Sequence, residues 1–143
     1  MTKKITMKQL IENSNLPAGL IRSVVRQSGS WESFQEMAQD IANHGVNGGF
    51  HGWIYYDDTL KFTRNNKKLI MEALENMAQD MGEGLLEMIR GFGVFRNDKS
   101  VTVDDIAKAI YQGKGEYAEQ VLNVLAWFAA EETARAYSDM LEA

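Results

Sequence analysis

The chain has 143 residues, 45% of them hydrophobic and 10% aromatic, which suffices for a folded core and is too apolar for a disordered protein. It contains no cysteine, which excludes disulfides, thiolate metal sites and a cysteine nucleophile. No stretch approaches the ~18 consecutive apolar residues of a membrane span, and the N-terminus lacks the apolar run of a secretory signal, so we expect a cytoplasmic protein.

The net charge of −5 is unevenly distributed along the chain. Residues 1–28 hold five Lys or Arg and one Glu, a net charge of +4, so residues 29–143 carry −9. Phosphate contacts need Lys and Arg, so the acidic part disfavours broad DNA binding and suits contact with a basic surface. We therefore expect a basic helical hairpin over 1–28 and an acidic helical body over 29–143, packed as one globular unit.

The first elements in chain order are two short helices separated by a turn. A helix over 6–14 with Thr6 as its cap, a turn over 15–18 and a second helix over 19–26 are predicted from the spacing of apolar residues. The apolar positions that define this pattern are Leu10, Leu16, Ile21, Val24 and Val25. Their spacing resembles the helix-turn-helix of the LacI-type repressor family.

That resemblance implies a DNA-binding role for the second helix. Ala18, Gly19 and Arg22 would face the major groove, and Arg26 would lie nearer the DNA backbone. The family prefers a small residue where Ile11 stands, because the two helices pack closely there. A hairpin that only contributes to the core would show the same spacing, so a helix-turn-helix DNA-binding regulator is the alternative interpretation.

A third helix and a glycine-rich loop follow. Ser30 is predicted to cap a helix over 31–41 that ends near Gly45. The stretch 49–56 is rich in glycine and aromatic residues and favours a short extended segment near 50–56. Glycine lets a backbone approach a ligand closely, so we take this loop as the candidate partner-binding surface, although its aromatics would also suit a core. The residues chosen are His44, Asn47, Phe50, His51, Trp53, Tyr55, Tyr56, Asp57 and Asp58.

The same loop holds both histidines of the chain. His44 and His51, with Asp57 or Asp58, offer nitrogen and oxygen ligands, but their spacing matches no metal motif. The loop also lacks the Gly-Lys-Ser/Thr ending of a phosphate-binding loop. A metal- or nucleotide-dependent enzyme centred on these residues is the least favoured interpretation. We predict no catalytic residue, no metal and no cofactor.

The strongest helical pattern of the chain lies at 66–81, where apolar residues recur at the three-to-four spacing of one helix face. Asp58 or Thr59 is predicted to cap the start of this helix. Gly82 stands where it should end.

Two more helices are predicted near the C-terminus. Thr102, followed by two aspartates, is a helix start, and that helix should end at Gly113. The longest candidate spans 116–141, and its middle, 121–130, is apolar on nearly all sides, which places it in the core. The prediction is thus an all-α domain of six or seven helices with one short extended segment.

Several sequence blocks carry a second resemblance. The most specific are Asn43-His44-Gly45 with Gly48 to Thr59, and Leu125 to Tyr137. With them, residues 31–137 resemble an uncharacterised family of bacteriophage and prophage proteins, a domain of unknown function. The Gly-Gly-Phe element is also similar to small anti-restriction proteins of plasmids. The resemblance implies a phage origin, transfers no catalytic residue and leaves the N-terminal 28 residues outside the matched region.

We therefore expect a phage-encoded accessory protein that works in the host cytoplasm by binding and not by catalysis. Its partner would be a host protein, such as a nucleic-acid-handling defence enzyme, which it inhibits or modulates in the manner of anti-restriction or anti-CRISPR proteins. The acidic body would face the basic groove of such an enzyme and steer association electrostatically. DNA is the partner only in the alternative interpretation. The sequence leaves the target and the formation of a homodimer open.

Overall fold

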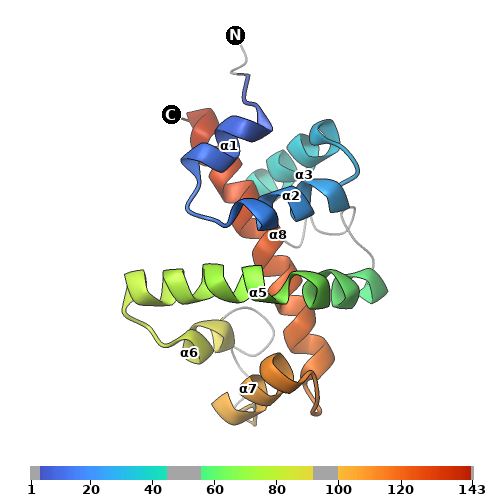
Figure 1. Cartoon of the computed structure of the whole chain (residues 1–143), viewed down its shortest axis with the longest axis vertical. Helices are drawn as coiled ribbons and strands as arrows, with labels where there is room; N and C mark the ends of the chain where they lie inside the picture. The colour runs from blue at the N-terminus through green and yellow to red at the C-terminus, as the bar shows by residue number, and fades with distance from the viewer. Residues whose placement is uncertain (1–3, 45–55, 92–99, 143) are drawn as a thin grey trace. The chain divides into compact units, whose positions relative to one another are not determined.

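The computed structural model describes residues 4–44, 56–91 and 100–142 (Figure 1). Within these ranges the chain forms helices and no strand, which confirms the predicted all-α class. The predicted extended segment near 50–56 lies outside the described residues except for Tyr56, which is helical. The helices are α1 (Met7–Asn13), α2 (Ala18–Gln27), α3 (Trp31–His44), α5 (Tyr56–Met81), α6 (Leu85–Arg90), α7 (Val103–Gln112) and α8 (Ala118–Glu142).

The chain divides into two compact units. Unit 1 comprises Met1–Asp58 and Trp127–Ala143, and unit 2 comprises Thr59–Ala126. Helices α1 and α2, which form the predicted basic hairpin, therefore belong to the same unit as α3 and the C-terminal part of α8. In Figure 1, α8 is the long helix coloured orange to red, and it contributes residues to both units.

The two N-terminal helices of unit 1 form where the sequence predicts them. Thr6 caps α1 through a reciprocal pair of bonds: the Gln9 backbone N–H donates to Thr6 Oγ1 at 3.2 Å, and the Thr6 N–H donates to Gln9 Oε1 at 2.9 Å. Helix α2 is amphipathic: it buries its apolar face and exposes its polar face. The buried residues of that face are Leu20, Ile21, Val24 and Val25.

Helix α3 begins at the predicted cap and packs through an aromatic cluster. The backbone N–H of Ser33 donates to Ser30 Oγ at 3.1 Å, which satisfies one free donor of the first turn. Phe34, fully buried, stacks on Trp31 with ring centroids 5.3 Å apart and meets Tyr137 edge-on at 5.8 Å. The cluster therefore ties α3 to the C-terminal part of α8 within unit 1.

Helix α5 of unit 2 begins earlier than predicted. It starts at Tyr56, so Asp58 and Thr59 are helical residues and do not cap the helix, contrary to the prediction. The buried face simply continues upstream of residue 66, because Thr59, Phe62 and Thr63 are all buried. The hydroxyl of Thr63 donates to the backbone carbonyl of Leu122 at 2.7 Å, so this buried hydroxyl has a hydrogen-bond partner on α8 within unit 2. Gly82, with φ of +72°, follows the helix as predicted.

The last two helices agree closely with the sequence pattern. Thr102 and Asp105 form a capping box at the start of α7, and Gly113, with φ of +65°, ends that helix in the left-handed region. Helix α8 begins at Ala118, and its residues 121–130 are buried with two half-buried exceptions, which confirms their place in the core. In the part of the chain that the structure describes, no helix is long and apolar enough to cross a membrane.

Candidate functional site

The segment between α1 and α2 forms a compact turn over 14–17. The backbone N–H of Leu16 donates to Ser14 Oγ at 3.0 Å, which stabilises the turn locally. Pro17 precedes α2, and its carbonyl accepts from the N–H groups of Leu20 at 3.0 Å and Ile21 at 3.3 Å. Proline suits this position because it has no N–H to satisfy and its φ is already restricted. The two helices and the turn thus have the order and lengths expected of a helix-turn-helix.

The residues predicted to contact DNA lie along the second of these helices. Arg22 and Arg26 are both exposed and stand four residues apart, so they share one face of α2. Neither guanidinium forms an ion pair with another residue that the structure describes. Ala18 and Gly19, in the first turn, are half-buried. The structure therefore brings Ala18, Arg22 and Arg26 to one side of α2, at successive turns of the helix.

Most of the residues chosen for the partner-binding loop cannot be placed. Asn47, Phe50, His51, Trp53 and Tyr55 lie outside the described residues. His44 ends α3, whereas Tyr56 and Asp57 open α5, and the side chains of these three residues are not described. Asp58 is exposed in the first turn of α5, where its negative charge interacts favourably with the positive end of the helix dipole. The binding role of this loop stays a prediction.

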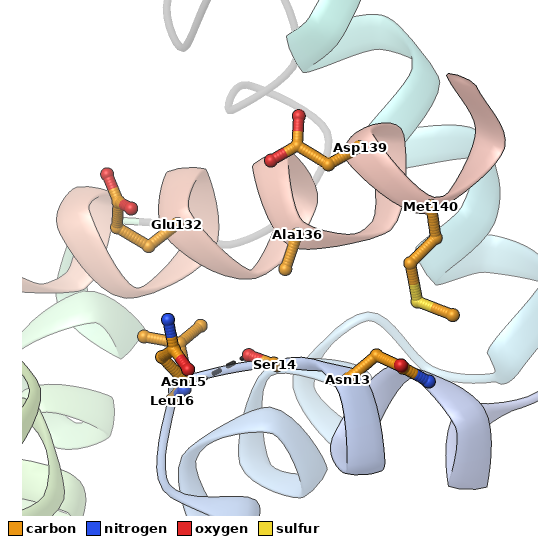
Figure 2. Close-up of a pocket in the computed structure, with 8 residues that line it drawn as sticks. All are labelled: Asn13, Ser14, Asn15, Leu16, Glu132, Ala136, Asp139 and Met140. Carbon is orange, nitrogen blue, oxygen red and sulfur yellow. Dashed lines mark hydrogen bonds between the residues drawn. The ribbon is translucent and has the colours of Figure 1, made fainter. Parts of the chain in front are cut away.

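Unit 1 also contains a cavity of about 550 Å³ between α8 and the end of α1 (Figure 2). Figure 2 shows Ala136 and Met140 pointing toward α1 and the turn that follows it, while the carboxylates of Glu132 and Asp139 project from another side of α8. The lining residues are Asn13, Ser14, Asn15, Leu16, Glu132, Ala136, Asp139 and Met140. The turn between α1 and α2 is thus one wall of this cavity.

Glu132, one of the residues that line the cavity, has a shifted pKa. Burial raises the pKa of Glu132 above its ordinary value of 4.5. The positive charge of Arg135 opposes this shift in pKa, and the negative charges of Glu131 and Asp139 add to it. Arg135 is itself exposed and pairs with Glu131 at 2.7 Å, so it does not bind the Glu132 carboxylate directly.

The raised pKa of Glu132 gives a pH dependence with a definite sign. A carboxyl whose pKa is higher in the folded state binds its proton more tightly there than in the unfolded chain. Its contribution to stability is therefore fully present below the unfolded pKa and is lost as the pH rises through the folded pKa.

We accordingly expect Glu132→Gln to raise the free energy of unfolding at pH 7 by roughly 0.5 kcal/mol, a modest amount because the side chain keeps contact with water. Urea unfolding at pH 4 and at pH 7 measures this effect, and Glu36→Gln, at an exposed position of α3, serves as the control. An equal gain in the Glu36 variant, or no gain at pH 7, would contradict the assignment.

The apolar pattern of α8 does not single out the residues that line this cavity. Ala136 and Met140 stand four residues apart on the side of α8 that faces the turn, whereas Glu132 and Asp139 project from another side. Nothing in that pattern indicates that the turn after α1 packs opposite this face.

Comparison with known proteins identifies the family of the chain. No curated protein and no solved structure matches it. The match to a family described as a domain of unknown function (DUF7222) covers residues 6–143 and therefore includes α1 and α2, which the resemblance seen in the sequence left outside. The expected membership of an uncharacterised family is confirmed: the chain belongs to the DUF7222 family of domains of unknown function.

Proposed function

We propose that this protein is a non-catalytic DNA-binding protein that uses α2 as its recognition helix. The observation that carries the proposal is the amphipathic division of α2. Leu20, Ile21 and Val24 are buried on one side, while Arg22 and Arg26 are exposed on the other without an ion-pair partner among the described residues. A hairpin serving only as core needs no such pair of arginines one turn apart.

The chemistry of this face suits a duplex. In helix-turn-helix proteins the second helix enters the major groove with its N-terminal residues near base edges. An arginine there binds guanine with two hydrogen bonds or pairs with phosphate, and the small Ala18 and Gly19 leave room for close approach. Lys4, just before α1, and Lys8, within α1, are also exposed and add positive charge.

The charge of the rest of unit 1 restricts how DNA would bind. Unit 1 holds six Lys or Arg and ten Asp or Glu, a net charge of −4. Most of its surface therefore repels phosphate, and attraction is concentrated on the basic residues of α1 and α2. We expect binding that depends on orientation and weakens steeply with salt.

The test is selection of bound duplexes from a random pool by the purified full chain at low salt, followed by sequencing. The expected result is enrichment of a short motif, since base contacts from one recognition helix discriminate sequences. If the bound pool stays as diverse as the input pool, the recognition-helix proposal is wrong.

We also propose a second candidate function, an accessory protein of phage origin that binds and inhibits a host protein. An acidic stripe on α3 favours it. Glu32, Glu36 and Asp40 are exposed and stand four residues apart, so they lie along one side of α3. Such a stripe is complementary to the basic groove of a nucleic-acid-handling defence enzyme.

Affinity capture of the tagged protein from host lysate, with and without nuclease, separates the two candidates. A single stoichiometric host protein that survives nuclease and is lost in a Glu32→Gln/Glu36→Gln/Asp40→Asn variant supports the host-protein function. Recovery of DNA alone, with every protein lost after nuclease, contradicts that function and supports DNA binding.

A further inference from the structure

A basic stretch on α5 of unit 2 stands apart from the helix-turn-helix. Residues 59–71 contain four Lys or Arg and no Asp or Glu. The rest of unit 2, residues 72–126, contains five Lys or Arg and ten Asp or Glu, a net charge of −5. Four of the nine Lys and Arg of this unit therefore lie close together on α5, directly after Asp57 and Asp58 at the start of that helix.

Three of these cations form a continuous exposed ridge. Lys61, Arg64 and Lys68 are all exposed, and their spacing of three and four residues places them on one face of α5. We call these three residues the α5 ridge. At 1.5 Å per residue the ridge extends about 10 Å along the helix axis. Lys67 is half-buried at its side, and the ridge stops at Glu72, one turn beyond Lys68.

The ridge is not explained by helix stability. Arg64 has Lys61 three residues before it and Lys68 four residues after it, and like charges at these spacings destabilise a helix. None of the three forms an ion pair with another residue in the described ranges, Glu72 included. Asp57 and Asp58 stand four and three residues before Lys61 and offset part of this repulsion, but they do not reach Arg64 or Lys68 at these spacings. An anionic partner that neutralises the ridge would remove the repulsion that remains.

We propose that the α5 ridge binds the phosphate backbone of a nucleic-acid duplex without reading its sequence. Phosphates along one strand follow each other about every 3.4 Å of duplex axis, so a ridge of this length spans several of them. The ammonium groups of Lys61 and Lys68 suit point contacts to phosphate, and the guanidinium of Arg64 can bind one phosphate through two hydrogen bonds. The inference rests on the proposed DNA binding for the identity of its partner, but it adds a second contact surface in a different unit.

The ridge makes a quantitative prediction about salt. Each cation that neutralises a phosphate of duplex DNA contributes about −0.9 to the slope of log K against log salt concentration. In an Arg64→Ala/Lys68→Ala variant of the full chain, that slope should become shallower by about 1.8, equally on duplexes of unrelated sequence. Fluorescence anisotropy with two labelled, unrelated duplexes measures it over a range of salt. Both side chains are exposed, so the fold should be retained, and circular dichroism checks this.

The matched control is Lys108→Ala/Lys114→Ala, which removes two exposed cations from elsewhere in unit 2. An unchanged slope in the ridge variant, or an equal change in the control, would overturn the proposal. Binding to vesicles of equal parts phosphatidylcholine and phosphatidylserine is measured in parallel. If the ridge variant loses binding to these vesicles but not to the duplexes, the partner is a membrane surface and the proposal is overturned.

The same titrations separate this inference from the proposed recognition helix. Suppose that Arg22→Ala/Arg26→Ala leaves DNA binding unchanged while the ridge variant has a shallower slope of log K against log salt concentration. Then α2 is not the recognition helix, and the ridge proposal is still supported. If only the α2 variant loses binding, the ridge proposal fails and the recognition helix stands. If the wild-type chain binds neither duplex at low salt, the ridge proposal fails, whereas the recognition helix is decided by the selection from the random pool.

Discussion

Replacement of Phe34 with alanine is expected to lower the free energy of unfolding by about 3–5 kcal/mol, the cost typical of removing a fully buried aromatic ring. Phe34 has no exposed surface and contacts two other aromatic rings, with centroids 5.3 Å away at Trp31 and 5.8 Å away at Tyr137. Its loss therefore opens a cavity and removes two aromatic contacts, of which the one to Tyr137 joins α3 to α8 within unit 1.

Chemical denaturation followed by tryptophan fluorescence measures this loss, with Trp31 as a reporter beside the mutated position. Tyr111→Ala is the matched control, because Tyr111 is an aromatic residue with 58% of its surface exposed, and we expect a change within about 0.5 kcal/mol there. A loss below about 1 kcal/mol in the Phe34 variant would mean that the cluster does not hold unit 1 together.

The second large effect is expected at the arginines of α2. Replacing Arg22 and Arg26 together with alanine should weaken binding to a selected duplex about 100-fold or more at low salt, because each lost base or phosphate contact costs roughly 1–3 kcal/mol. The slope of log K against log salt concentration should also become shallower by about 0.9, through the loss of the phosphate contact assigned to Arg26. Titrations by fluorescence anisotropy at several salt concentrations measure both quantities.

Two controls make this result interpretable. Arg22 and Arg26 are exposed, so the unfolding free energy of the variant should stay within about 0.5 kcal/mol of the wild type. Lys108→Ala/Lys114→Ala removes the same charge from exposed positions outside α2 and should keep the sequence preference. An unchanged affinity in the Arg22/Arg26 variant would show that α1 and α2 are a structural hairpin only.

The family match changes how the N-terminal helices are interpreted. Because it begins at residue 6, α1 and α2 are part of the shared domain and not an appended arm. Helix α2 and the three residues of the α5 ridge both lie inside the matched range.

The sequence by itself determined the features that depend on neighbouring residues. Helix starts at Thr6, Ser30 and Thr102 were predicted because each side chain bonds a backbone N–H within the next turn, an interaction that needs no distant partner. Helix ends at Gly82 and Gly113 were predicted because glycine adopts positive φ readily. Apolar periodicity likewise identified the buried face of α2 and the core segment of α8.

Only the tertiary structure decided the features that join distant segments. The early start of α5 was missed because aromatic and glycine residues before it favour extended structure locally, whereas the bond from Thr63 to the Leu122 carbonyl forms only once α8 lies alongside. The cavity in unit 1 also requires two segments more than a hundred residues apart to meet. The spacing of apolar residues along the sequence shows which face of a helix can be buried. Packing between helices decides what that face contacts.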